Sequence, residues 1–141
     1  VEDGIVAGGG VCFLAACSVL DSVQTSDADE KIGVEIIRKA LEAPVRTIAN
    51  NAGFEGSVVV EKIKALPTGQ GLDSASGQYG DMIEMGVLDP VKVTRTTLQN
   101  AASVASLILI TEATVSEMPK DTTIEESISR AAAQGGQGGM Y

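Results

Sequence analysis

The sequence contains no histidine and no tryptophan, and its aromatic residues make up only 3% of 141 residues. The absence of imidazole excludes zinc sites built on histidine and nucleophilic triads that use histidine as the base. Cys12 and Cys17 are too few for a structural zinc site made of cysteine alone. We therefore expect no metal site in this chain.

Positive charge is also scarce, because 10 Lys and Arg residues stand against 19 Asp and Glu residues, for a net charge of -9. Nucleic-acid binding requires clustered Lys and Arg to neutralise phosphates. Apolar runs such as residues 107–110 are far shorter than the ~20 residues of a membrane-spanning helix. We expect neither a nucleic-acid partner nor a membrane partner.

Hydrophobic residues make up 44% of the chain, so its core must consist mainly of Val, Ile, Leu and Ala, a composition typical of closely packed helices. The length suits one domain or a piece of one. Cys12 and Cys17 lie five residues apart on an expected helix, so we interpret them as buried, unpaired thiols. The start Val1-Glu-Asp-Gly4, without an initiator Met, indicates a fragment of a longer chain.

The first half of the chain predicts two helical segments. Apolar spacing indicates a core helix over residues 10–20. After an acidic loop, Asp27 and Glu30 resemble a helix-start box. The amphipathic segment that follows has one apolar face, and Pro44 predicts a kink or break near Ala43. The residues of that face are Ile37, Leu41, Val45 and Ile48.

The second half predicts a small hairpin and one long helix. Residues 57–66 fit strand or helix, and we favour helix. Glycines in residues 67–80 indicate a hairpin with short strands around Leu72 and residues 76–79. Asp89 and Pro90 are the favoured N-cap and first residue of a helix running to about Leu109, with a buried stripe of small residues.

Beyond that helix, residues 113–118 indicate a short strand that ends at Pro119. Residues 121–141 become acidic and then glycine-rich, which predicts a flexible tail.

Two features suggest ligand chemistry. Gly8, Gly9 and Gly10 lie between an extended segment and a helix start, where a ligand can approach the backbone. By pattern alone a plain turn is favoured over a nucleotide contact. Asp89 needs no ligand either, because an Asp before Pro is an ordinary helix cap.

Four collinear stretches nevertheless match one family, and a tail of Gly-Gly-Met type adds a fifth. They are Val1-Glu-Asp-Gly-Ile-Val-Ala-Gly-Gly-Gly10, Ala40-Leu-Glu-Ala-Pro44, Tyr79-Gly-Asp-Met-Ile-Glu-Met-Gly-Val-Leu-Asp-Pro90, and Val93-Thr-Arg95 with Leu98-Gln-Asn-Ala-Ala-Ser-Val-Ala105. The chain resembles the large subunit of group I chaperonins, the GroEL type.

The resemblance implies a mainly α fold, namely the helical bundle of the chaperonin equatorial domain with a small β-hairpin and a C-terminal strand. Residues 1–120 correspond to the C-terminal portion of that ATP-binding, ring-contact domain. The family's phosphate-binding loop, its two catalytic aspartates and its apical substrate-binding domain precede the matched region. The parent is thus expected to be an ATPase, whereas this chain lacks the catalytic residues.

The resemblance also assigns binding residues for ATP or ADP. Gly8 and Gly9 correspond to glycines that contact the ribose, and Asp89 to an aspartate that accepts hydrogen bonds from ribose hydroxyls. Val87 corresponds to an aliphatic residue under the adenine ring. Bound Mg²⁺ and K⁺ would have their ligands outside this chain.

Three further residues, Asp73, Ser74 and Ala75, stand where the family's adenine pocket commonly has Asn-Ala-Ala. Aspartate accepts hydrogen bonds but does not donate them, so side-chain recognition of adenine is expected to differ here. Ser74 and Ala75 would contribute backbone contacts.

Subunit contacts are implied as well. By resemblance, Arg46, Glu55, Ser57 and Val58 lie at the contact between rings, and the strand at residues 113–118 joins a neighbouring subunit's hairpin. The partners expected are identical subunits in a double ring, with a co-chaperonin and unfolded proteins bound through the apical domain. The location implied is the bacterial cytoplasm or an organelle matrix or stroma.

The function expected is therefore part of an ATP-dependent chaperonin that assists protein folding. This chain would supply the nucleoside-binding half of the ATP site together with contacts between subunits and rings. The alternative is an isolated structural or oligomerisation fragment without nucleotide binding.

Overall fold

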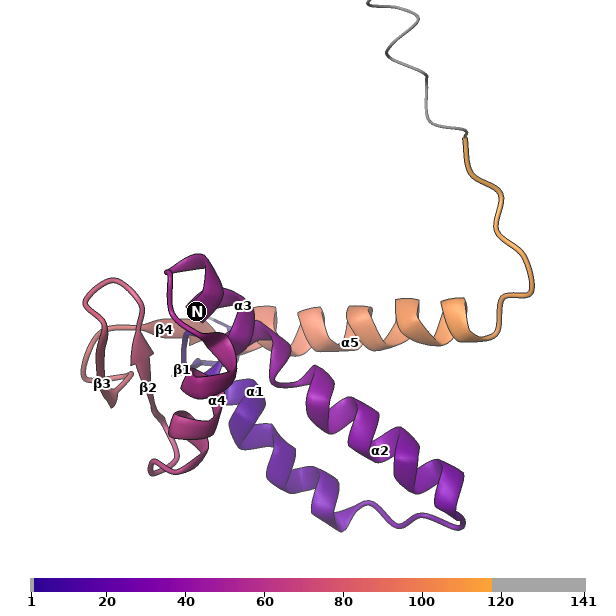
Figure 1. The fold of residues 1–141 in the computed structure, drawn as a ribbon, viewed down its shortest axis with the longest axis horizontal. Helices are drawn as coiled ribbons and strands as arrows, with labels where there is room; N and C mark the ends of the chain where they lie inside the picture. The colour runs from indigo at the N-terminus through magenta and orange to yellow at the C-terminus, as the bar shows by residue number, and fades with distance from the viewer. Residues whose placement is uncertain (1, 118–141) are drawn as a thin grey trace, which may run out of the picture. The chain divides into compact units, whose positions relative to one another are not determined.

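The computed structural model describes residues 2–117 and divides the chain into two compact units, Val1–Val104 and Ala105–Tyr141. Helices dominate the first unit, and two pairs of short antiparallel strands accompany them (Figure 1). The elements in chain order are β1 (Ile5–Ala7), α1 (Val11–Ala16), the 3-10 helix η1 (Cys17–Ser22), α2 (Ala28–Ala40), α3 (Ala43–Asn51), α4 (Gly56–Lys64), β2 (Gln70–Asp73), β3 (Gln78–Asp81), β4 (Leu88–Pro90) and α5 (Val91–Leu109). The mainly α class with a small hairpin is confirmed.

The helix expected over residues 10–20 is divided into α1 and η1. The hydroxyl of Ser18 donates to the Ala15 carbonyl at 2.9 Å, and that of Ser22 donates to the Val19 carbonyl at 2.7 Å. Such local bonds compete with the regular helical ladder and favour the tighter 3-10 turn. Cys12 and Cys17 are free, as expected, but both are half-buried rather than buried.

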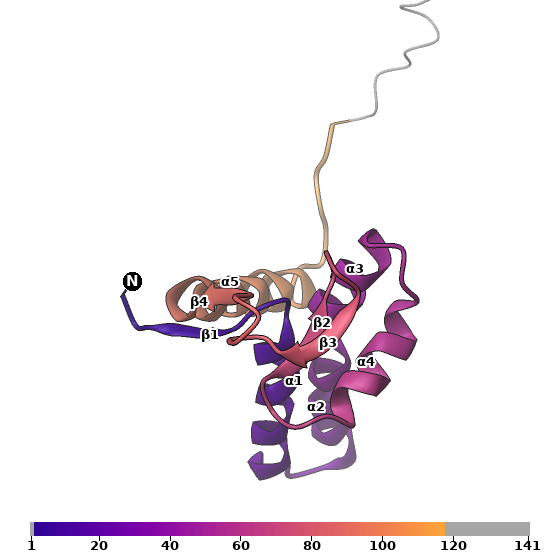
Figure 2. The same ribbon diagram turned by 90° about the vertical axis from the view of Figure 1, so that its left-hand side faces the viewer.

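The segment α1–η1 runs alongside α2 (Figure 2). Arg38 of α2 joins them, because its guanidinium donates to the Cys17 carbonyl at 3.1 Å and pairs with Asp21 at 2.8 Å. Asp27 caps α2 as predicted, with its Oδ1 accepting from the Glu30 amide at 2.9 Å. The Glu30 carboxylate accepts from the Ser26 amide, one residue before the cap, and so completes the helix-start box in a shifted form.

Pro44 breaks the amphipathic segment as predicted. It lies in the first turn of α3, where its missing amide costs no helical hydrogen bond. The expected apolar face is only half right, because Leu41 and Val45 are buried whereas Ile37 and Ile48 are 47% and 39% exposed. The break interrupts the helical period, so a face defined along one continuous helix does not continue through it.

The main core lies where α3 and α4 pack against the β2–β3 hairpin (Figure 2). Gly56 permits the close approach of the two helices, since a β-carbon placed on it would lie 2.6 Å from the Arg46 carbonyl oxygen. The helix favoured for residues 57–66 and the hairpin are both confirmed. The buried cluster consists of Val45, Ala49, Val59, Val60, Ile63 and Leu72.

The helix α5 reaches Leu109 as predicted but begins at Val91, and none of its residues is buried. The expected buried stripe is therefore wrong, because small residues are buried only where another element packs on them. The strand predicted at 113–118 is also absent from residues 113–117, where Val115 is fully exposed and no partner strand pairs with the backbone. Met118 and the predicted tail at 121–141 lie outside the described residues.

Candidate functional site

The strands β1 and β4 bring two segments that are far apart in the sequence together. They pair antiparallel with Val6 opposite Asp89 (Figure 1). Directly beyond this pair, the Gly8 amide donates to the Val87 carbonyl at 2.9 Å. A β-carbon placed on Gly8 would lie 3.0 Å from that carbonyl oxygen, so a side chain here would force the Val87 backbone to shift. Gly8, Val87 and Asp89 are thus neighbours in the fold.

The glycine turn then leads into α1. Gly9 and Gly10 have φ angles of 66° and 82°, in the left-handed region that favours glycine. A β-carbon on Gly9 would lie 3.9 Å from the Leu72 carbonyl oxygen and 4.0 Å from Cγ1 of Val87. The turn therefore borders both the β2–β3 hairpin and the segment before β4. Since α1 has only six residues, its dipole contributes little positive charge at this turn.

Asp89 does not cap α5. It lies within β4, where its backbone pairs with Val6, and the first amide of α5, on Val91, donates to the Gly4 carbonyl at 3.1 Å instead. The sequence predicted a helix cap because an Asp before a Pro can stand either at a helix start or at the end of a strand. The half-buried Asp89 side chain lies near α1, and the pKa of Cys12 is raised by burial and, secondarily, by the Asp89 charge.

The three residues at the end of β2 form their own turn. One oxygen of Asp73 accepts from the Ala75 amide at 3.0 Å, and the other accepts from the Ser76 hydroxyl at 2.5 Å. These bonds, first that from Ser76, hold the pKa of Asp73 below its usual range. The Ala75 amide is thus engaged within the turn, which leaves its carbonyl, together with the backbone and hydroxyl of Ser74, as the polar groups for a ligand.

The site residues therefore differ in how closely they gather. One group consists of Gly8, Gly9, Val87 and Asp89, which are neighbours in the fold. The hairpin borders this group at Leu72, whose carbonyl oxygen lies near Gly9. Asp73, Ser74 and Ala75 follow Leu72 along the chain, and no hydrogen bond among residues 2–117 joins them to the glycine turn. Sequence reasoning missed Leu72 and Met82, which are buried beside the turn. Their burial depends on the packing of the hairpin region against α4 and the glycine turn, which the local pattern does not encode.

The residues assigned to the ring contact all lie on the α3–α4 pair. Arg46 pairs with Glu42 at 2.7 Å. Glu55 caps α4 by accepting from the Ser57 amide at 3.4 Å, and the same oxygen accepts from the Ser57 hydroxyl at 2.6 Å. The pKa of Glu55 is lowered, mainly by Ser57 and to a smaller degree by the charge of Arg46. Val58 is 63% exposed. These four residues form one mixed polar and apolar surface, which is a suitable composition for a subunit contact.

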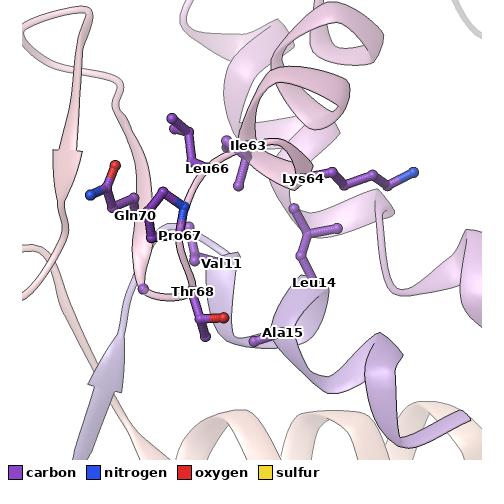
Figure 3. A pocket seen from close by; sticks show the side chains of 10 residues that line it. Val11, Leu14, Ala15, Ile63, Lys64, Leu66, Pro67, Thr68 and Gln70 are labelled. Atoms are coloured by element: carbon purple, nitrogen blue, oxygen red, sulfur yellow. The ribbon is translucent and has the colours of Figure 1, made fainter. Parts of the chain in front are cut away.

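A small cavity of about 150 Å³ lies next to α1 (Figure 3). It is lined by α1, the end of α4 and the loop before β2, and Lys64 stands at its edge. None of the seven predicted site residues lines it. The cavity is smaller than an ordinary small-molecule pocket.

Among residues 2–117, no three acidic or cysteine side chains are grouped closely enough to hold a metal ion. No helix in this part of the chain is long and apolar enough to cross a membrane.

A comparison with protein families gives one match that covers most of the chain. Residues 1–119 match the sequence model of the TCP-1/cpn60 chaperonin family. The matched region contains the glycine turn, both strand pairs and all five α-helices.

Proposed function

Because the chain belongs to the TCP-1/cpn60 chaperonin family, we propose that it is the C-terminal portion of the equatorial domain of a group I chaperonin. Its role is to supply the nucleoside-binding half of an ATP site. The rest of that site, with the phosphate loop, the catalytic aspartates and the ligands of Mg²⁺ and K⁺, belongs to the preceding part of the same subunit.

The pairing of β1 with β4 is the observation that carries this proposal. It brings the backbone of Gly8, which is buried, and that of Gly9, which is half-buried, next to Val87 and Asp89. Glycines without side chains let a sugar approach the backbone, and a carboxylate accepts hydrogen bonds from two adjacent hydroxyls. An aliphatic side chain next to them supplies an apolar surface for a base. The combination fits a nucleoside and leaves the phosphates to other residues.

The wider assembly follows from the same proposal. Family membership implies oligomeric assembly and substrate proteins in general. We extend this to identical subunits in a double ring, with the α3–α4 surface at the ring contact, and to a co-chaperonin and unfolded proteins bound by the apical domain. The residues 113–118 would then form their strand only against a neighbouring subunit. The proposed location is the bacterial cytoplasm or an organelle matrix or stroma.

Asp89 offers the sharpest test, because it is not a helix cap and its removal should leave α5 intact. In the full-length subunit, we expect Asp89→Asn and Asp89→Ala to weaken ADP binding by about tenfold, since a charged hydrogen bond contributes ~1.5–3 kcal/mol. Isothermal titration calorimetry measures the affinity, and urea unfolding checks the stability.

Glu84→Gln serves as the matched control, because it also removes one negative charge from an exposed residue of the neighbouring turn. It should bind ADP like the wild type. If both Asp89 variants retain the wild-type affinity, Asp89 does not contact the nucleotide and the proposed site is wrong.

One observation favours the alternative of a structural or oligomerisation module. Ile32 and Ile36 on α2 are 58% and 62% exposed, and residues 107–110 at the end of α5 and just beyond it are exposed as well. Such apolar surfaces are typical of regions that pack against other chains or domains. A thermal-shift titration with ADP separates the two functions, because only a nucleotide-binding chain melts at a higher temperature as ADP increases.

A further inference from the structure

Met82 is fully buried and lies between two glycine segments of the candidate site. Its side chain has an exposed fraction of 0%. A β-carbon placed on Gly9 would lie 3.0 Å from Cε of Met82, and one placed on Gly71 would lie 2.9 Å from its Sδ. The thioether therefore fills the space beside the glycine turn on one side and beside β2 on the other. Both neighbours lack a side chain, which leaves room for it.

Three backbone hydrogen bonds run in series, and Met82 takes part in two of them. The Met82 amide donates to the Gly69 carbonyl at 3.1 Å, and the Met82 carbonyl accepts from the Val87 amide at 2.8 Å. The Val87 carbonyl in turn accepts from the Gly8 amide at 2.9 Å. Gly69 directly precedes β2 and Gly8 directly follows β1. The series thus connects the hairpin to the glycine turn through Met82.

We propose that Met82 is a positioning residue that holds the β2–β3 hairpin and the Gly8–Gly9 turn at a fixed separation, so that both present their backbone to one nucleoside. This inference rests on the proposed function, since it concerns the same site. Met82 touches the residues that would contact the ligand and has no exposed surface of its own. Its effect on binding is therefore indirect and acts through preorganisation of those residues.

The side-chain shape is part of this inference. Methionine is unbranched, so Sδ can lie against Gly71 while the terminal Cε reaches Gly9. Leucine has nearly the same volume and remains buried, but it branches at Cγ and lacks the terminal atom next to Gly9. Met82→Leu should therefore keep the fold while loosening the contact with the glycine turn.

The test compares Met82→Leu with Val60→Ala in the full-length subunit. Val60 is also fully buried, but it lies on α4 and takes no part in the hydrogen-bond series. Hydrogen–deuterium exchange of peptides covering Gly8 reports on the turn, and calorimetric titration with ADP reports on the site. We expect Met82→Leu to exchange faster at Gly8 and to bind ADP roughly tenfold more weakly. Val60→Ala should lose stability yet keep both the Gly8 exchange and the ADP affinity of the wild type.

The possible outcomes distinguish a failure of this inference from a failure of the proposed function on which it rests. If the wild type binds no ADP, the proposed function fails and the inference fails with it. If the wild type binds ADP and Met82→Leu binds equally well, only the inference is overturned. It is also overturned if Met82→Leu loses affinity without faster exchange at Gly8, or if Val60→Ala loses affinity to the same extent.

Discussion

At the scale of single residues, Gly10 connects the candidate site to the core. It stands where the glycine turn enters α1, and its φ angle of 82° lies in the left-handed region. A β-carbon placed on it would lie 2.9 Å from the Val45 backbone nitrogen and 3.1 Å from Cβ of Pro44. Backbone conformation and packing both exclude a side chain at this position, so the path of the turn depends on glycine.

We predict that Gly10→Ala lowers the free energy of unfolding by about 2–5 kcal/mol. The left-handed conformation costs an alanine roughly 1–2 kcal/mol, and overpacking against α3 adds roughly 1–3 kcal/mol. Urea unfolding followed by circular dichroism measures the loss.

The matched control is Gly33→Ala in α2, where a β-carbon would meet no atom within 4 Å. Replacing a glycine inside a helix should stabilise the chain by up to about 1 kcal/mol. A Gly10→Ala variant as stable as the wild type would contradict the tight packing of the turn against α3.

At the scale of elements, Glu42 joins α3 to α4. Its side chain is only 12% exposed, and its two oxygens lie 2.8 Å from Nζ of Lys64 and 2.7 Å from Nη2 of Arg46. The hydrogen bond from Lys64, followed by the other contacts, holds the pKa of Glu42 below the ordinary glutamate value. This ion pair connects the two helices that carry the proposed ring contact and border the main core.

The lowered pKa of Glu42 predicts a pH-dependent contribution to stability. The stabilisation is complete above the unfolded pKa of about 4.5, and it is lost as the pH falls through the lower pKa of the folded state. At pH 7 we expect Glu42→Gln to cost about 1–2 kcal/mol, because a hydrogen bond to a charged group is weakened. The difference from the wild type should shrink as the pH approaches about 3.

Urea unfolding at a series of pH values between 7 and 3 tests this. Glu61→Gln is the control, since Glu61 pairs with the same Lys64 but its side chain is 73% exposed. Exposed pairs contribute little, so this variant should lose less than about 1 kcal/mol at pH 7. A gap between wild type and Glu42→Gln that stays constant with pH would show that the ion pair is not the source of the stabilisation.

At the scale of the whole molecule, the proposed half-site implies binding without chemistry. Phosphoryl transfer depends on positioned groups and metal ions around the γ-phosphate. The glycine turn, Val87 and Asp89 would contact only the nucleoside end, and residues 2–117 contain no cluster suited to a metal ion. Contacts to the nucleoside alone stabilise the bound state and the transition state equally.

We therefore predict that the 141-residue chain alone binds ATP weakly and releases no phosphate above background. The assay is phosphate release by highly purified protein with Mg²⁺ and K⁺ present. Turnover that follows the chain through a final sizing column, and that disappears in Asp89→Ala, would show that the half-site is a complete enzyme.

Local signals in the sequence were sufficient for much of the secondary structure. The Asp27 cap, the break at Pro44, the helix at residues 57–66 and the hairpin are all present. Each depends on residues within a few positions of one another, where capping, ring sterics and turn geometry act directly. For the candidate site, the glycine turn and Asp89 were recognised by resemblance to group I chaperonins, and membership of the broader TCP-1/cpn60 chaperonin family is confirmed.

The tertiary structure alone decided which residues are buried and which distant segments pair with one another. Asp89 entered a strand opposite Val6 instead of capping α5, Met82 became fully buried, and the stripe on α5 remained unburied. These outcomes depend on contacts between segments far apart in the sequence, and hydrophobic periodicity specifies a face without specifying its partner. The sequence by itself thus determined where helices and turns form, whereas long-range pairing determined how they assemble into a site.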